Sequence, residues 1–409
     1  MTLEIRPVGD DELPAYFEAM TTAFLDRPDV EKVAEEVRPL WNLDQTLAAV
    51  QDGRICGTFR TWDTELTVPG LGLLPAGAVS AVTVLPSHRR RGILRRMVAA
   101  GHALARDRGD AVSLLYASEY PIYGRFGYGP AVQSGTWVLD TGATGFHGAD
   151  PGGITIEKPS LAIVDELQSV GDAWRRAHPG EIRRRPYRWE FDLGLRPTAW
   201  GDTWKGFLAV HRADGGAIDG FARYRAEQKW ELRQPRVTLL VDDFHTLTDG
   251  AHAALWRFLA AVDWVSTIKV EHASPSDRLP WLLTNARAAR MEDVGDGLWV
   301  RLLDVPRALE ARTYERSGCV VLEVVDGEAT GGRLRVELDA SPEGASCRPV
   351  DRSPDLTLDA SALGAAYLGG VPLRQAVLAR GADEHRAGAL REAEALLRTA
   401  DEPLCTTFF

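Results

Sequence analysis

The sequence reads VTVLPSHRRRGILRR from Val82 to Arg96, and this stretch decides the fold. It includes the end of an apolar run, AVSAVTVL (78–85), that is typical of a buried strand. After Pro86 and a basic loop, Gly92 precedes a helix expected over residues 93–106, whose apolar residues recur at helical spacing. Another apolar run, AVSLLYA (111–117), predicts a second buried strand. Strands and helices that alternate in this way favour an α/β (α+β) fold.

The loop after Pro86 has the chemistry of an anion site. Five Arg fall within residues 89–96, and the first N–H groups of the expected helix are unpaired and carry partial positive charge. Gly92 lets the backbone approach a ligand closely, and Arg89 and Arg90 add charged donors. These features predict a phosphate or pyrophosphate cradle, with a solvated basic helix start as the alternative. Neither GxxxxGK[ST] nor GxGxxG is present, so the loop is neither a Walker loop nor a dinucleotide fingerprint.

A second motif reads ASEYPIYGRFGYGP from Ala117 to Pro130. Residues 89–94 resemble the coenzyme A pyrophosphate loop of the Gcn5-related N-acetyltransferases (GNAT), although Leu94 stands where many members carry Gly or Ala. Together the two motifs resemble the Eis (enhanced intracellular survival) family of bacterial acetyltransferases. The resemblance implies tandem GNAT folds followed by a sterol-carrier-protein-like α+β domain. The expected domains are an acetyl-CoA-binding domain (1–145), a GNAT-like domain without cofactor (146–302), and a domain that supplies the C-terminal carboxylate (303–409).

The resemblance also implies acetyl-CoA as the acyl donor and assigns its contacts. The backbone of Val82 and Val84 would pair with the pantetheine amides, and the N–H of Val82 would polarise the thioester carbonyl. Ser118 resembles a pantetheine contact, although a lone Ser at this position would by default be a helix cap. The expected donor contacts are Val82, Val84, Arg89, Arg90, Gly92, Ile93, Leu94 and Ser118.

Tyr123 is the candidate general acid. A phenol with an unperturbed pKa of about 10 is protonated at neutral pH, and it can donate to a departing thiolate whose conjugate acid has a pKa of about 8.5. Without its motif, a Tyr between Ile122 and Gly124 would be read as a core residue. Tyr128, five residues later, is expected to pack and not to catalyse.

The candidate general base is less local. Asp26, Glu65 and Glu119 are carboxylates that could take the proton, whereas the resemblance implies that the main-chain carboxylate of Phe409 does so. A terminal carboxylate has an unperturbed pKa of about 3.3–3.7, and partial burial would raise it. Two terminal aromatics would anchor the tail, which would otherwise fray.

The expected acceptor wall consists of Asp26, Phe24, Trp41 and Trp62. Asp26 resembles a substrate contact of the family, and the aromatic residues are the kind of side chains that also simply pack. Relatives often carry an acidic residue just before the last one, and this chain has Phe408 there. This difference counts against efficient aminoglycoside acetylation and favours a more apolar amine.

Composition limits the partners. The chain has 409 residues and a formal net charge of −11, so it repels nucleic acid and anionic membranes as a whole and suits a cationic amine. Of its 47 basic residues 42 are Arg, and most of this excess is interpreted as genomic composition. Four Cys without CxxC spacing, no apolar segment of membrane-spanning length and no visible signal peptide lead us to expect a cytoplasmic protein without a metal.

The rest of the chain is not expected to bind acetyl-CoA. The counterpart of the phosphate loop, HTLTDGA (245–251), lacks Arg and carries Asp249, which would repel a pyrophosphate. Residues 141–159 are rich in Gly and predict a linker.

The leading function is acetyl-CoA-dependent N-acetylation of small polyamine or aminoglycoside-like amines by direct attack in a ternary complex. The alternatives are a lysine or peptide N-acetyltransferase and a non-catalytic coenzyme A- or lipid-binding regulator, and a homohexamer is implied by the resemblance.

Overall fold

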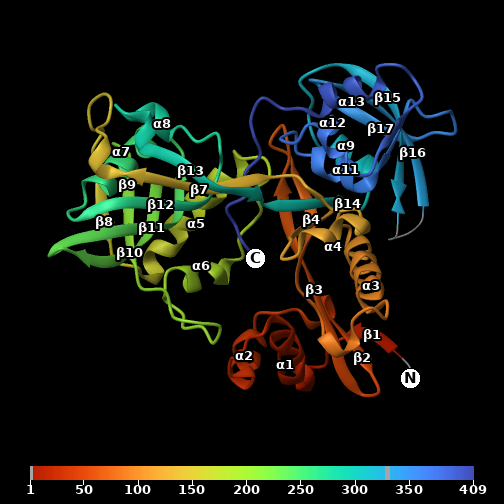
Figure 1. Cartoon of the computed structure of the whole chain (residues 1–409), viewed down its shortest axis with the longest axis horizontal. Coiled ribbons are helices and arrows are strands. Elements are labelled where there is room, and N and C mark those ends of the chain that lie inside the picture. The colour runs from red at the N-terminus through yellow and green to blue at the C-terminus, as the bar shows by residue number, and fades with distance from the viewer. Residues whose placement is uncertain (1–2, 328–331) are drawn as a thin grey trace.

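The computed structural model describes residues 3–327 and 332–409, which form three sheets (Figure 1). The first sheet is antiparallel except for β4 and β5, which are parallel because α3 connects them as a crossover. Its strand order is β1 (Leu3–Pro7), β2 (Thr46–Gln51), β3 (Arg54–Thr67), β4 (Leu73–Val84), β5 (Val112–Tyr116), β14 (Leu298–Leu302) and β6 (Gly129–Pro130). Its helices are α1 (Leu13–Phe24), α2 (Val30–Val37), α3 (Ile93–Arg108) and α4 (Tyr120–Tyr123).

The second sheet repeats this plan, with β11 and β12 as its parallel pair and α7 as the crossover. Its strand order is β13 (Ala289–Asp296), β7 (Gln133–Asp140), β12 (Val265–Ala273), β11 (Gln234–Thr246), β10 (Ile218–Glu231), β9 (Phe207–Arg212) and β8 (Ile154–Glu157). Its helices are α5 (Leu161–Arg176), α6 (Pro186–Asp192), α7 (Asp249–Ala261) and α8 (Leu279–Leu282). The Gly-rich stretch 141–159, expected to be a linker, contains the edge strand β8, so this expectation was wrong for residues 154–157.

The third sheet is built from residues after 317. Its strand order is β17 (Gly344–Pro349), β16 (Gly332–Ser341), β15 (Gly318–Asp326), β18 (Leu356–Asp359) and β19 (Ala382–Glu384). Its helices are α9 (Val305–Glu310), α11 (Ala360–Ala366), α12 (Leu373–Ala376) and α13 (Ala389–Leu397). All four Cys are free thiols, three of them buried.

Two strands lie in a different sheet from the one expected from domain boundaries at residues 145 and 302. β7 lies in the second sheet although it precedes residue 145, and β14 returns from the second part of the chain to the first sheet. The two crossings are side by side, since Ala131 N and Val132 N donate to Leu298 O and Gly297 N donates to Val132 O. The first two sheets are therefore joined by two adjacent chain segments and not by one flexible linker.

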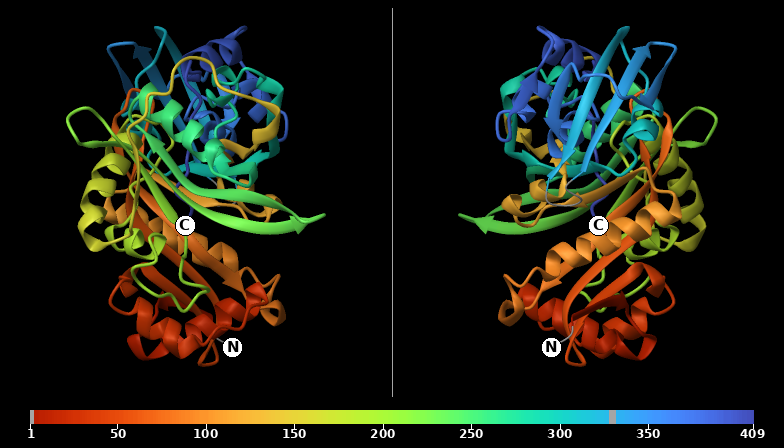
Figure 2. Two further views of the ribbon diagram at one scale, coloured as in Figure 1. Left: turned by 90° about the vertical axis from the view of Figure 1, so that its left-hand side faces the viewer. Right: turned by 90° about the vertical axis from the view of Figure 1, so that its right-hand side faces the viewer.

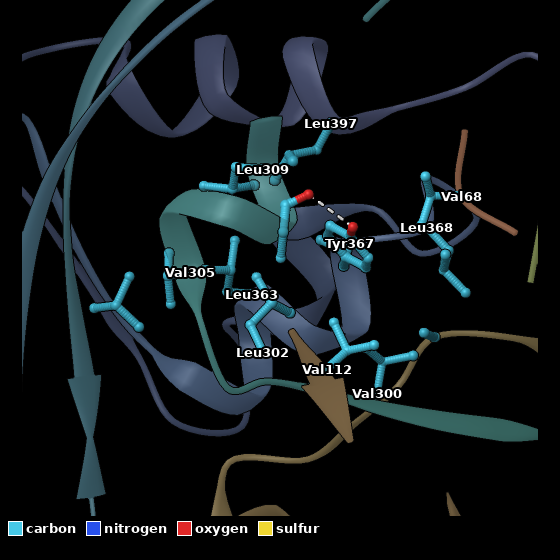
Figure 3. Packing of buried hydrophobic residues seen from close by; sticks show 14 of the residues in the cluster. Val68, Val112, Val300, Leu302, Val305, Leu309, Leu363, Tyr367, Leu368 and Leu397 are labelled. Atoms are coloured by element: carbon cyan, nitrogen blue, oxygen red, sulfur yellow. Dashed lines mark hydrogen bonds between the residues drawn. The ribbon is translucent and has the colours of Figure 1, made fainter. Parts of the chain in front are cut away.

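The third domain packs onto the first sheet through one apolar cluster (Figure 3). Val112 and Val300 of the sheet lie beside Leu363 of α11 and beside Tyr367, one helical turn later. Tyr367 is fully buried, and its hydroxyl donates a hydrogen bond of 2.7 Å to Ala308 O. This cluster fixes α11 against the strand β14. The last residues then run back between the first two sheets, where Figures 1 and 2 show the C-terminus in the middle of the molecule.

Candidate functional site

The parallel strands β4 and β5 separate before they end. Their pairing covers only the register from Ala76 opposite Val112 to Ala78 opposite Leu114, whereas β4 continues to Val84. Among the described strands, none pairs with this edge of β4 beyond Ala78. The N–H and C=O groups there need partners, because strong backbone hydrogen-bonding groups do not stay unpaired away from water. The opening can therefore accept an extended ligand that carries amides.

A bulge aims the backbone of β4 into this opening. Between the pairs of Arg60 with Ser80 and of Thr58 with Thr83, two β4 residues lie opposite one β3 residue. One of the two, Ala81, has φ of 53°, and the other is Val82. Thr58 Oγ1 donates 2.7 Å to Ala81 O and so pins the bulge. Because a bulge leaves a residue out of the ladder, the regular pairing of β4 with β3 is interrupted at Ala81 and Val82.

The helix that follows begins with open amides. Gly92 is the residue before the first turn of α3, has φ of 76°, and provides no side-chain cap. A Cβ there would meet no atom within 4 Å, so the conformation and not crowding requires Gly. The first amides, including those of Ile93 and Leu94, therefore point out of the helix without a capping acceptor. An uncapped helix start of this kind has the free N–H donors that an N-terminal anion site requires.

Four of the five Arg near this helix fall into two groups. Arg91 Nη2 donates 3.1 Å to Ser87 O and Arg96 Nη2 donates 2.8 Å to Leu3 O, so these two support the fold. Arg89 and Arg90 are exposed and have no hydrogen bond or ion pair to any residue of 3–327 or 332–409. Arg90 also holds a positive φ of 64°. Both guanidinium groups expected to grip the donor are thus without a partner among the described residues.

Two tyrosines lie close together beyond β5, and their environments differ. Tyr128 is fully enclosed, and its hydroxyl bonds to His102 Nε2 at 2.9 Å and to Ser113 Oγ at 2.7 Å. It therefore packs, as expected. Tyr123 ends α4, and its hydroxyl forms no hydrogen bond with a described residue. Burial, and then Glu119, raises the pKa of Tyr123 to about 12, so its proton is retained at neutral pH and is available to a ligand.

The acceptor-side candidates lie on β3, on the segment after α2 and at the end of α1. Trp41 and Trp62 lie on either side of Arg60, whose guanidinium is 4.0 Å from the Trp41 ring and 5.9 Å from the Trp62 ring. Phe24 and Asp26 lie at the exposed end of α1, where Asp26 Oδ1 accepts 2.8 Å from Arg27 N. Ser118 is exposed just after β5.

Sequence reasoning missed two cations beside this wall. Arg60 is 6% exposed, its Nε and Nη2 have no hydrogen-bond partner among the described residues, and burial lowers its pKa to about 10. Arg185 lies 4.4 Å from the Trp62 ring and reaches the wall from the second domain. Arg60 and Trp62 are two residues apart on β3, so their side chains lie on the same face of the sheet. This spacing could have identified Arg60 from the sequence. Nothing local pointed to Arg185.

The chain end reaches the same wall. The Phe409 ring meets the Trp62 ring edge-on with centroids 5.5 Å apart, and it meets Tyr116 of β5 at 5.3 Å. Among the alternative carboxylates, Glu65 is engaged by Arg175 at 3.3 Å, and Glu119 is exposed next to α4. Phe409 is therefore the candidate base that the fold brings against the acceptor wall.

The second sheet has the same opening but a different helix start. β11 pairs with β12 only up to Val241 and Val270, and a cavity of about 910 Å³ lies along their separated ends. Thr248 caps α7 by accepting 3.1 Å from Ala251 N, and Asp249 and Asp219 add carboxylates there. The start of α7 therefore has a side-chain cap and an Asp249 carboxylate that pairs with Arg278, whereas the start of α3 is uncapped and carries no acidic residue in its first turn.

The described residues form neither a metal-binding cluster nor a helix that could span a membrane. Within residues 3–327 and 332–409, no group of three or more His, Cys, Asp or Glu side chains has the arrangement of a metal site. No helix in the described part of the chain has the length and apolar character needed to cross a membrane.

Comparison with protein families confirms the expected order of domains. Residues 4–131 match the GNAT acetyltransferase domain family, and residues 180–302 match a second family with the same description. Residues 305–406 match the sterol carrier protein domain family. The chain is thus a tandem GNAT protein with a sterol-carrier-like C-terminal domain.

Relatives of similar length extend this result to the whole chain. An uncharacterized N-acetyltransferase of Streptomyces griseus is 40% identical over the full length of both chains. The N-acetyltransferase Eis of Mycobacterium tuberculosis is 34% identical over 99% of this chain and 95% of its own. The crystal structure of Eis1 from Mycobacterium abscessus superposes with a TM-score of 0.85 at 31% identity, over 99% of this chain and all of its own. The chain therefore belongs to the Eis family of GNAT N-acetyltransferases.

Proposed function

We propose that this N-acetyltransferase moves the acetyl group of acetyl-CoA to a primary amine of a small acceptor by direct attack in a ternary complex. The observation that carries this proposal is the unpaired edge of β4 followed by the uncapped start of α3, with Tyr123 in the same apolar cluster as Val82 and Val84 and with the Phe409 ring against Trp62 and Tyr116. Family resemblance supports polyamines and aminoglycoside-like amines as the acceptor class.

The donor fits the residues that the chain leaves without partners. The unpaired β4 edge at Val82 and Val84 suits the pantetheine amides, and the α3 start with Arg89, Arg90, Gly92, Ile93 and Leu94 suits the pyrophosphate. Ser118, exposed after β5, is proposed as a further pantetheine contact. When bound, acetyl-CoA supplies a thioester, an acyl group that an amine can take while a thiolate leaves.

The chain's own groups would handle the two protons. Tyr123 keeps its proton at neutral pH and would donate it to the departing sulfur. The main-chain carboxylate of Phe409 would take the proton that the amine loses, and the N–H of Val82 would hold the negative charge on oxygen. The placement of the Phe409 ring against Trp62 and Tyr116 supports this assignment.

Removing the unpaired guanidinium groups should weaken donor binding without slowing the chemical step. Replacing Arg89 or Arg90 by Ala should raise the Kd for acetyl-CoA about tenfold each, because a hydrogen bond to a charged group contributes about 1.5–3 kcal/mol and exposure reduces this. Calorimetric titration measures the change, and kcat at saturating donor should stay near the wild-type value. Arg91→Ala, which loses a backbone contact, is the control.

The same titration should saturate at one acetyl-CoA per chain, because α7 starts with a Thr248 cap and carboxylates where α3 starts with open amides. Saturation at two per chain, or an unchanged Kd in both Arg variants, would contradict the proposed site.

The residues around Trp62 favour a primary amine that is more apolar than the polyamines and aminoglycoside-like amines suggested by the family resemblance. Trp41, Trp62 and Phe409 offer apolar surface, while Arg60 and Arg185 place positive charge beside Trp62. Asp63 lies 3.7 Å from Arg185 and offsets part of this charge, whereas the buried Arg60 has no ion-pair partner among the described residues and disfavours a polycation. We therefore expect amines with an apolar body and one charge to be acetylated faster than aminoglycosides or polyamines. Asp26 and Phe24, at the exposed end of α1, are proposed to contact the acceptor from the entrance.

A panel of acceptors tests both the reaction and its class. Release of free thiol from acetyl-CoA should be followed with an aromatic monoamine, a polyamine, an aminoglycoside, a lysine-containing peptide and no acceptor. We expect amine-dependent release, fastest with the monoamine. Turnover with the peptide alone would favour a peptide acetyltransferase, and binding without any turnover would favour a regulator that binds coenzyme A.

Assembly and location are proposed from the resemblance. We propose a cytoplasmic homohexamer without nucleic-acid or membrane partners, supported by the four free thiols and the net charge of −11. Sedimentation velocity measures the assembly.

A further inference from the structure

The last six residues follow a defined path between the first two sheets. Leu404 N donates 2.9 Å to Pro179 O, and the Tyr116 hydroxyl donates 3.3 Å to Thr407 O. Phe408 stacks on His272 with ring centroids 5.6 Å apart. The C-terminal end thus has partners in both sheets, and Figures 1 and 2 show it in the middle of the molecule.

One carboxylate accepts contacts from three consecutive residues of this tail, Cys405, Thr406 and Thr407. Glu181 Oε2 accepts from Thr406 N at 2.7 Å and from Thr406 Oγ1 at 2.9 Å. Glu181 Oε1 accepts from Thr407 N at 3.2 Å, and the Cys405 thiol lies 3.7 Å from it. Burial, and then Glu181, raises the pKa of the Cys405 thiol well above its usual range, so the thiol keeps the hydrogen that it points at the carboxylate.

Glu181 depends on these contacts in return. The residue is 1% exposed, and within the described residues it has no ion-pair partner. A buried carboxylate without a counterion is costly unless hydrogen bonds replace its water. Its other donor is Ile182 N at 3.1 Å, so the tail supplies the larger share.

The backbone of Glu181 is fixed to the strand that carries the acceptor wall. Thr67 N donates 2.9 Å to Glu181 O, Gly180 N donates 2.8 Å to Thr67 O, and Leu66 forms a bridge with Ile182. Thr67 and Leu66 end β3, five and four residues after Trp62. The tail, Glu181, β3 and Trp62 are therefore connected by hydrogen bonds and by chain continuity.

The tail also lies in the opening of the second sheet. Thr406 Oγ1 is 3.3 Å from His245 Nε2 on β11, past the last β11 residue that pairs with β12. Phe408 contacts His272 of β12, which is likewise past the last paired residue. Leu404 and Thr406 line the 910 Å³ cavity there. In this domain the separated strands hold the chain's own tail.

We infer that Glu181 is a positioning residue for acetyl transfer, which holds residues 405–407 so that the carboxylate of Phe409 meets the acceptor amine. This inference rests on the proposed function of Phe409. It also explains what the second GNAT domain contributes, because the opening in its sheet seats the tail that serves the site of the first domain.

The test compares Glu181→Gln with the control Glu166→Gln, which changes an exposed carboxylate of α5 that pairs with Arg212. A Gln amide cannot accept all the tail donors, because one of its two heavy atoms is itself a donor. We expect kcat to fall at least about tenfold in Glu181→Gln, the equivalent of losing one or two hydrogen bonds to a charged group. The Kd for acetyl-CoA should stay within about twofold of the wild type, and the control should be unaffected.

Hydrogen exchange provides a readout that does not need activity. Amides of residues 404–409 should exchange faster in Glu181→Gln and not in Glu166→Gln. If Glu181→Gln does not fold, Thr406→Val keeps Glu181 and removes only the Thr406 hydroxyl, with the same direction expected in both readouts. Slow exchange of the tail together with wild-type kcat in Glu181→Gln would overturn the inference.

Combining Glu181→Gln with deletion of Phe409 separates the inference from the proposed function. If Glu181 acts through Phe409, the substitution should leave the residual rate of the shortened chain unchanged. A further fall in that rate by the same factor as in the full chain would overturn the inference. If deletion of Phe409 alone leaves kcat unchanged, the proposed role of Phe409 fails, and faster tail exchange in Glu181→Gln would then show that the clamp exists without that catalytic purpose.

Discussion

A chain extended by one Gly after Phe409 should bind acetyl-CoA normally and lose at least about 100-fold in kcat, the lower bound for removing a general base. The extension keeps the Phe409 ring, which packs against Trp62 and Tyr116, and moves the carboxylate away from the position that this packing gives it. The rate at saturating acetyl-CoA and amine measures the loss, and calorimetry confirms donor binding.

The matched variant is Phe409→Leu, which keeps the terminal carboxylate and an apolar side chain. Its kcat should stay within about tenfold of the wild type, because only ring packing is lost. Melting temperatures of the two variants should be similar. Wild-type turnover by the extended chain would show that another carboxylate, such as Glu119 or Asp26, takes the proton.

Tyr123→Phe should lower kcat by about 100- to 1000-fold with little change in the Kd for acetyl-CoA, within the range that a general acid contributes. The substitution removes one hydroxyl that no described residue uses and leaves the packing against Tyr128, whose ring centroid is 6.1 Å away. Tyr128→Phe is the control for stability, because its hydroxyl bonds to His102 and Ser113 within the core. We expect Tyr128→Phe to lower the free energy of unfolding and to retain most of the wild-type kcat. The opposite pattern would make Tyr128 the general acid and Tyr123 the packing residue.

The pH dependence follows from the same tyrosine. Burial raises the pKa of Tyr123 to about 12, above the unfolded value of about 10. Its proton is therefore present throughout neutral pH, and kcat should not decline between about pH 7 and 9 through loss of this acid. Since burial favours the neutral phenol, the stability linked to it is complete below about pH 10 and is lost as the pH rises towards 12.

The donor side of the site could be predicted from sequence because it is local. A strand, Pro86, two exposed Arg and Gly92 before a helix lie within fifteen residues, and the structure has the strand and the helix at these positions, while the donor contacts stay a prediction. Tyr123 and Tyr128 could be assigned different roles for a similar reason, since one motif contains both.

The rest depends on long-range contacts that no local pattern records. Arg185 reaches Trp62 from another domain, and Glu181 holds residues more than 220 positions later. The Gly-rich composition of residues 141–159 suggests a boundary after β7. The structure instead places β7 in the second sheet and β14 in the first sheet. Phe24 and Asp26 were grouped with Trp41 and Trp62, and the structure places the first two at the exposed end of α1.

The most direct test of direct acetyl transfer is a quenched single-turnover reaction that counts free coenzyme A, acetylated amine and acetyl groups on the protein itself. We expect thiol and acetylated amine to form together in equal amounts, with no thiol released before the amine is added and no acetyl group on the chain. Release of thiol without an acceptor, or an acetylated chain that later transfers its acetyl group to the amine, would contradict direct attack in a ternary complex.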